Sequence, residues 1–500
     1  MSTGSKYKTR IIKSGDWAGY ENIAQFVSGL VGPETITGSG IDSSSVSRLK
    51  KGETDSMISA GTGVDAASFT DGRALQYESL EAKLQSITLS EDDCRFWQLL
   101  PKNPVHATID QYNRHTSRGN EWGSTRAEYG NPEYQISTIA RAYEEMAHYK
   151  ELRQISDVSM MVNMTENPRL RQQQDGLVNI LHKLSRHLFW NVRTALPTGV
   201  NGFFAKIAAE TDPNVVDFGG DVLDSQEPIH KLTAVIRNRG GRITHLIMNP
   251  LLQEDFNSIF ENSQRVALPV AADRMYAGGY FGGMQTAFGT IDFESDPFNV
   301  VGWEYPTVAQ GFTGRPTAPT LTSATAGSTG GTIPTGTYYY RVTAINADGE
   351  SITDDSDAVS VTLGQKVTIV ITPAGTGNDP TGYRIYRSAK DGVATDCRYL
   401  WCVADSGAAT TTFVDDGTWV PGTAHIAVAD LRRQATTMQW SQLQPAAMKN
   451  LATMGDWEWF LIVMRGVFRM SKPEWNGMLR NVLPKVVLDE GWDPLGLHAT

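Results

Sequence analysis

The sequence predicts an α+β protein into which an all-β sandwich is inserted. Three observations predict this class. One long helical pattern occupies 168–193, helix and strand patterns alternate over 226–312, and strands without a convincing helix fill 316–423. Mixed patterns return after the sandwich with too little apolar periodicity for a separate domain, so 424–500 is expected to complete the sheet begun earlier.

The long helix is expected to begin at Asn167-Pro168, a capping residue followed by a proline in the first turn. Pro197 ends the pattern. A helix of this length crosses a whole domain and acts as its backbone. The apolar residues at helical spacing are Leu170, Leu177, Leu181, Leu184, Leu188 and Val192.

The second mixed region begins with a helix over 228–238 that ends at Gly240-Gly241. The strand ITHLIM follows, and Asn249-Pro250 then opens the helix LLQEDFNSIF. Glycine-containing β-like runs occupy 265–304. In the tail, PAAMKNLATM is a candidate short helix and WFLIVMRGVFRM a strand.

The sandwich is clearest at 335–351, TGTYYYRVTAINADGES, where apolar or aromatic side chains alternate and Asp348-Gly349 supplies a turn. Further alternating runs begin near 359, 367, 383 and 399, separated by turn signals such as GTGNDPTG. Spacing of this kind is typical of one β-sandwich domain.

The first 85 or so residues are rich in Ser, Gly and Thr and cannot bury enough apolar surface alone, so they are either disordered or an arm ordered on another subunit. Residues 98–136 form a long polar excursion without an amphipathic helix. A solvated loop and a contact-forming loop both remain open for this stretch.

The net charge of −11 argues against a protein whose main task is gripping nucleic acid. Three cysteines are too few for a disulfide framework, and Cys397 and Cys402, five apart in one strand, point to opposite faces. The N-terminus lacks the apolar core of a secretory signal. No apolar run is long enough to span a bilayer, so no membrane association is expected.

Motifs of catalysis and metal binding are absent from the sequence, which predicts no catalytic residue, no cofactor and no metal site. His182 and His187 are expected on a solvated helix face. Trp440, Trp457, Trp459 and Trp475 crowd the tail, where burial or a subunit contact is favoured over stacking on sugars or bases.

The chain resembles the major capsid proteins of tailed bacteriophages with the Hong Kong 97 type fold. DGLVNILHKLSRHLFWNV, GGRITHLIMNPLLQEDFNSIF and ALPVAADRMYAGGYFGGMQTAFGTIDFESDPF carry the likeness. The insertion resembles immunoglobulin-like or fibronectin type III domains. YYYRVTAINADGES is similar to the sixth strand of the fibronectin type and GYRIYRS to the third, in reversed chain order.

The resemblance implies a division of the chain into six parts. These are an N-terminal arm (1–90), an extended loop with its flanks (91–140), a peripheral domain (141–225) with the spine helix 168–193, an axial domain (226–315), the sandwich (316–423) and a return segment (424–500). Some relatives crosslink subunits through a lysine, and Lys102 lies in the corresponding region without a matching motif.

The function that the resemblance implies is an icosahedral head built from hexamers and pentamers around packaged double-stranded DNA. The chain would be assembled in the host cytoplasm and localised in the virion. The sandwich is expected to face outward on steric grounds, because a domain of its size on the inner face would occupy packaging volume at every subunit. Portal and scaffolding proteins are expected partners, and a decoration protein is a further one.

Two other functions are weighed. A phage or cell-surface glycan-binding protein would use Tyr339, Trp401 or Trp419 of the sandwich as stacking platforms. A hydrolase would use paired carboxylates such as Asp292 and Glu294, which alternate along one strand. No nucleophile accompanies that pair, so the chain is expected not to be an enzyme.

Overall fold

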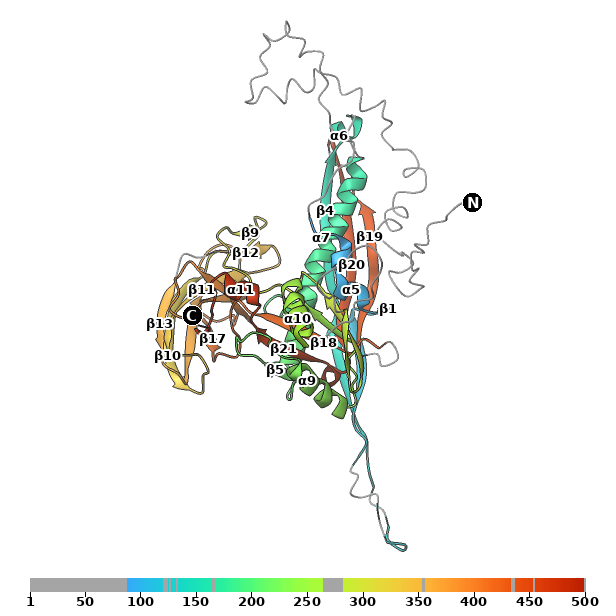
Figure 1. The fold of residues 1–500 in the computed structure, drawn as a ribbon. Coiled ribbons are helices and arrows are strands. Elements are labelled where there is room, and N and C mark those ends of the chain that lie inside the picture. The colour runs from blue at the N-terminus through green and yellow to red at the C-terminus, as the bar shows by residue number, and fades with distance from the viewer. Residues whose placement is uncertain are drawn as a thin grey trace, which may run out of the picture. The chain divides into compact units, whose positions relative to one another are not determined.

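The computed structural model describes residues 88–119, 125, 127–131, 134–162, 167–263, 282–352, 356–432, 437–452 and 455–498 (Figure 1). The described residues form both helices and strands, with most of the helices before Ser263 and strands dominating after Gly283, which confirms the α+β class. The predicted arm 1–90 lies outside the described residues except for 88–90. The chain separates into two compact units. Unit 1 holds Tyr149–Leu181 and Gln444–Arg465, and unit 2 holds Asp92–His148, His182–Leu443 and Gly466–Thr500.

The long helix is confirmed as α7 (Pro168–Trp190), which ends three residues before the predicted limit. Its start is capped as predicted, because the Asn167 side-chain oxygen accepts the backbone N–H of Arg169 at 3.0 Å. In unit 1 the helix lies along β4 (Ala147–Ser156) and β20 (Trp457–Met470) (Figure 1). Gly176 faces Ile462 so closely that a Cβ there would lie 2.6 Å from the Ile462 Cδ1 atom.

A six-stranded sheet forms the centre of unit 2. Its β18 pairs antiparallel with both β6 and β21, so strands that follow the sandwich in sequence complete a sheet begun before it. In order, its strands are β5 (Val215–Asp217), β21 (Gly477–Val482), β18 (Ala424–Ala429), β6 (His245–Met248), β8 (Gly289–Ser295) and β7 (Gly283–Thr286).

Two predicted helices cover this sheet's core. They are α9 (Glu227–Asn238) and α10 (Pro250–Ser263), and both match their predicted positions. Ile236 of α9 and Phe256 of α10 are fully buried in one apolar cluster with strand residues such as Leu246. The β-like runs predicted over 265–304 are represented by β7 and β8, whereas 264–281 lies outside the described residues.

A second sheet has the order β1 (Lys102–Pro104), β19 (Met438–Asn450), β20, β4. The strand predicted as WFLIVMRGVFRM is confirmed as β20. The helix predicted for PAAMKNLATM is wrong, because residues as far as Asn450 continue β19. Strand β1 pairs with Trp440, Ser441 and Gln442 of β19. Pro445, which has no backbone N–H to donate, lies beyond this paired stretch, so it costs no hydrogen bond to β1.

Short helical elements connect the sheets. They are α5 (Arg95–Leu99), α6 (Asp157–Met161), α8 (Phe203–Ala208), α11 (Lys485–Asp489) and the 3-10 turns Glu91–Asp93 and Pro473–Trp475.

Residues 320–415 form two antiparallel sheets that share one apolar core, in which Val342 and Ile385 of one sheet meet Val367 and Ile369 of the other. One sheet has the order β10 (Thr320–Thr329), β14 (Gln365–Thr372), β17 (Thr411–Asp415). The other has β16 (Cys397–Ala404), β15 (Gly382–Ser388), β11 (Gly336–Ile345), β12 (Gly349–Glu350) and β9 (Gln310–Gly311), with β13 (Asp357–Val361) also paired to β11.

The predicted strands of this region are therefore confirmed. The segments that resemble the third and sixth strands of the fibronectin type are β15 and β11, and they pair as neighbours. Kinship with immunoglobulin-like domains and the predicted six-part division of the chain stay predictions. Cys94, Cys397 and Cys402 are all buried, and none of them forms a disulfide.

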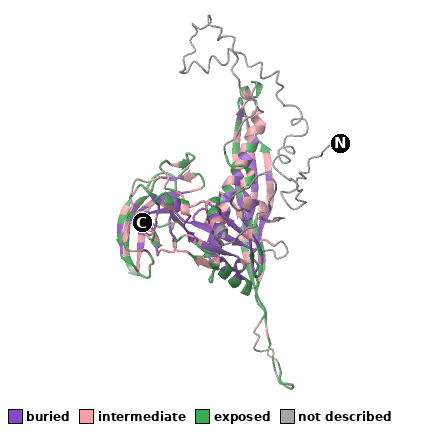
Figure 2. Cartoon of the chain, viewed as in Figure 1, coloured by how far each residue is buried: buried purple, intermediate pink, exposed green. Residues whose placement is uncertain are grey.

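The sandwich packs closely against the rest of unit 2. The Thr381 hydroxyl donates to the Ala195 carbonyl at 2.9 Å, and a Cβ on Gly382 would lie 2.8 Å from the Ala195 Cβ. The Trp303 ring lies 4.7 Å from the Tyr399 ring. Buried residues continue from the sheet that contains β18 into the sandwich (Figure 2). The sandwich is thus a packed part of this unit rather than a module on a free linker.

Candidate subunit-contact surface

A two-stranded ribbon makes few contacts with the rest of the described chain along most of its length. It joins β2 (Ile109–Ser117) and β3 (Thr138–Glu145) antiparallel, with Ile109 opposite Glu145 and His115 opposite Ile139. The excursion predicted at 98–136 contains the end of α5, β1 and β2. The sequence signal that could have located the ribbon is TIARAYEE, in which Ile139, Arg141 and Tyr143 alternate with smaller or acidic residues.

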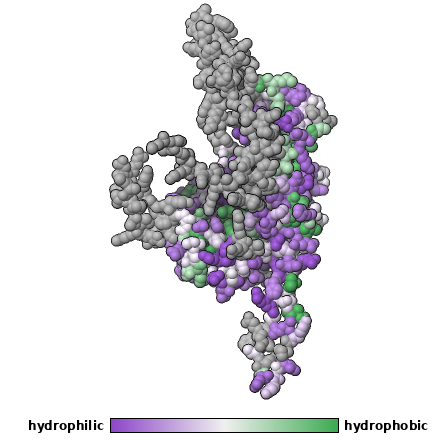
Figure 3. All heavy atoms as spheres, turned by 90° about the vertical axis from the view of Figure 1, so that its right-hand side faces the viewer, coloured by the Kyte–Doolittle hydropathy of each residue, from purple (hydrophilic) through white to green (hydrophobic). Residues whose placement is uncertain are grey.

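Most of the ribbon is exposed on both faces, and it appears green along most of its length in Figure 2. Tyr143 is 66% exposed and Ile139 61% exposed. Hydrophobic residues lie among hydrophilic ones along the narrow extension in Figure 3. A two-stranded ribbon is marginally stable alone in water, so a surface that covers it would stabilise it.

The ribbon is anchored near one end. The Tyr112 hydroxyl donates to the Met470 carbonyl at 3.3 Å, and burial raises the pKa of Tyr112, which keeps this donor protonated. Arg193 forms an ion pair with Glu145 at 2.9 Å, and Lys206 pairs with Glu144. These contacts fix the direction in which the ribbon leaves the sheets of unit 2.

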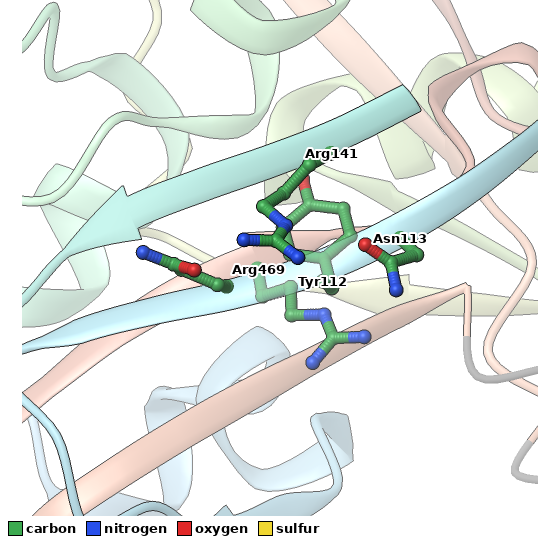
Figure 4. Close-up of a pocket in the computed structure, with 5 residues that line it drawn as sticks. Tyr112, Asn113, Arg141 and Arg469 are labelled. Carbon is green, nitrogen blue, oxygen red and sulfur yellow. The ribbon is translucent and has the colours of Figure 1, made fainter. Parts of the chain in front are cut away.

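An open groove of about 470 Å³ lies at this anchored end (Figure 4). Gln111, Tyr112 and Asn113 of β2 line it, together with Arg141 of β3 and Arg469 of β20. Figure 4 shows the labelled side chains gathered around one space from these three strands. Two guanidinium groups and two amides make this a donor-rich groove, suited to anionic oxygens.

Two of the three residues predicted as stacking platforms on the sandwich are brought together by the fold. Trp401 and Trp419 stack on each other with ring centroids 4.0 Å apart and an interplanar angle of 11°. The other neighbours of Trp419 include His425 at 5.2 Å and the Arg480 guanidinium, also at 5.2 Å. Tyr339 lies on β11 and is half-buried. Each tryptophan thus has one ring face taken by the other, and a ligand-binding role for the three residues stays a prediction.

The carboxylates of the hydrolase hypothesis do not form an isolated pair. Glu294 accepts two hydrogen bonds from the Arg95 guanidinium, at 2.8 and 3.0 Å. Asp292 is mostly exposed, 4.0 Å from the His245 ring nitrogen. Lys102 is buried, and its ammonium donates to the Trp97 carbonyl at 2.6 Å at the end of α5. That contact places the Lys102 ammonium inside its own subunit.

The solvated helix face predicted for His182 and His187 is wrong. Both are half-buried, the His182 ring lies 4.8 Å from Phe298, and burial lowers the pKa of His187 to about 3 with a further contribution from Lys183. Of the tail tryptophans, Trp440 is fully buried and Trp457 is exposed. Trp459 and Trp475 are half-buried.

Within the described ranges, no group of three or more His, Cys, Asp or Glu side chains is arranged to hold a metal ion. Likewise, none of the helices that the structure describes is long and apolar enough to cross a membrane.

Of the known proteins compared with this chain, only solved structures match it. No family model and no curated protein matches the chain. The capsid of a native GTA particle is 9% identical, with 84% of this chain and 100% of that chain covered and a TM-score of 0.46. A structure from Mycobacterium phage Adephagia is 8% identical, with 84% and 98% covered and a TM-score of 0.42.

The holo-SrpI encapsulin complex from Synechococcus elongatus PCC 7942 is 8% identical, with 83% of this chain and 95% of that chain covered and a TM-score of 0.39. With TM-scores below 0.5, the likenesses assign no function by themselves.

Proposed function

We propose that this chain is the major capsid protein of a tailed bacteriophage, a structural protein that assembles with copies of itself into hexamers and pentamers. These close into an icosahedral head around packaged double-stranded DNA. The observation that carries the proposal is the β2–β3 ribbon. It is extended, exposed on both faces and rich in residues that favour protein contacts, so a neighbouring copy would cover it.

The rest of the chain supports the same role. Within unit 2, ion pairs such as Arg193 with Glu145 hold the ribbon at one end. The net charge of −11 suits a container that does not clamp the DNA it encloses. In this proposal the chain has no enzymatic role, and the spine helix belongs to a peripheral domain and the six-stranded sheet to an axial domain.

The remaining parts of the proposal follow from that role. The chain would be assembled in the host cytoplasm and reside in the virion, with portal and scaffolding proteins as further partners and a decoration protein as an additional one. The sandwich would face outward, because a domain of its size at every subunit would otherwise occupy packaging volume.

The ribbon provides the test. We expect the double variant Ile139→Asp and Tyr143→Asp to abolish shell formation while leaving thermal unfolding of the subunit nearly unchanged, because both side chains are exposed. Sedimentation velocity measures assembly, and circular dichroism measures folding. Val393→Asp, at a 59% exposed position of the sandwich, is the matched control and should assemble normally. Shells formed by the ribbon variant at the wild-type level would contradict the proposal.

A further inference from the structure

Two cationic side chains, Arg141 and Arg469, line the groove at the base of the ribbon, and its described lining includes no carboxylate. Arg469 pairs with Asp110 at 3.6 Å. Arg141 is exposed and forms no ion pair with any residue that the structure describes. One of the two positive charges is therefore available to an anionic group.

The second guanidinium of the groove is held in place. Arg469 donates through Nε to the Ser471 hydroxyl at 2.9 Å, and its guanidinium lies 4.3 Å from the Tyr112 ring centroid. Its partner Asp110 is buried and accepts a hydrogen bond from the Ser441 hydroxyl at 2.5 Å. The groove therefore combines Arg469, a fixed donor, with Arg141, which has no ion-pair partner among the described residues (Figure 4).

The donors determine the chemical class of the ligand. Guanidinium groups bind carboxylate and phosphate oxygens through paired N–H donors, and the amides of Gln111 and Asn113 add further donors at the rim. Asn113 lies directly opposite Arg141 in the ribbon, and Gln111 lies opposite Tyr143. These four residues share one face of the ribbon because strand side chains alternate.

The same face identifies the occupant. Ile139 and Tyr143 lie two residues on either side of Arg141, and both are largely exposed. A small anion would leave them in water, whereas a protein surface would cover them together with the groove. A second copy of this chain, with its net charge of −11, supplies such a surface with carboxylates in excess. We propose that this groove binds a side-chain carboxylate presented by a neighbouring copy. The inference rests on the proposed function and assigns Arg141 as the residue that orients the ribbon on its neighbour.

The test compares Arg141→Glu with Arg141→Lys and with Arg237→Glu. The last variant makes the same charge change at an exposed position of α9. We expect Arg141→Glu to reduce the assembled fraction in sedimentation velocity about tenfold, because the new carboxylate would repel the carboxylate of the neighbouring copy. Arg141→Lys should reduce the assembled fraction less, since it keeps the charge and loses the planar fork. Arg237→Glu should assemble as the wild type does, and all three should show wild-type thermal unfolding.

A second measurement separates the two sources of an anionic oxygen. Inorganic phosphate should slow assembly of the wild type more than chloride at matched ionic strength, through competition for the groove. If phosphate raises the melting temperature in an Arg141-dependent way while Arg141→Glu assembles normally, the groove is a small-anion site and the inference is wrong. If the wild type and Arg141→Glu both assemble normally, the role of Arg141 is wrong while the proposed function stands. A wild type that never assembles removes the proposed function and this inference with it.

Discussion

Replacing Asp415 by leucine should lower the free energy of unfolding by about 3–5 kcal/mol, because it leaves a buried arginine without its counter-charge. The Arg387 side chain is fully buried between the two sheets of the sandwich, and its Nη1 lies 2.5 Å from the Asp415 Oδ2 atom. The Tyr340 hydroxyl donates to the same oxygen at 2.9 Å. One carboxylate therefore joins β11, β15 and β17 across the core.

A double-variant cycle distinguishes the loss of a partner from the loss of the pair. Arg387→Met combined with Asp415→Leu should recover most of the stability lost in Asp415→Leu, since neither charge is then buried alone. Urea denaturation of the full chain, followed by intrinsic fluorescence, measures both. Lys231→Ala is the control, because its pair with Glu227 is exposed and screened by water and should contribute little to the free energy of unfolding. A double variant less stable than Asp415→Leu would contradict this explanation, because removing the lone buried charge would then not have recovered stability.

Acidification should destabilise the fold through His425, which is buried among Trp190, Phe204 and Trp419. Burial lowers the pKa of His425 from 6.5 to about 4. Between these two pH values His425 is protonated in the unfolded chain and neutral in the folded chain. This contribution to stability is complete above pH 6.5, is lost progressively as the pH falls towards about 4, and amounts to roughly 3 kcal/mol in full.

The difference between wild type and His425→Gln isolates this contribution. Its slope of stability against pH should be about 1.4 kcal/mol per pH unit between these limits and near zero above pH 6.5. Both proteins share the opposite contribution of Asp296, whose pKa burial raises to about 6, so it cancels in the difference. Equal pH slopes for the two proteins would show that His425 does not titrate abnormally.

The elements that the sequence predicts well are those whose signals are local. Asn167, Pro168 and the leucine repeat locate α7 because capping and one-sided burial act within a few turns. The strands of the sandwich are equally clear, since one face of each is buried. PAAMKN is different, because its residues favour helix locally whereas pairing with distant strands makes them part of β19.

The candidate contact surface could be predicted only in part. The polarity of 98–136 indicates exposure, but β2 lacks the alternation of apolar and polar residues that identifies a strand, and only TIARAYEE of β3 shows it. Arg141 and Arg469 both line the groove but lie far apart in the sequence, so no local sequence pattern predicts it. The stack of Trp401 on Trp419 likewise depends on tertiary packing.

Negative-stain electron microscopy of the purified chain, alongside its sedimentation profile, shows whether the chain builds a shell from copies of itself. We expect closed shells or rings of six and five subunits. A chain that stays monomeric at every concentration, including under macromolecular crowding, would contradict it.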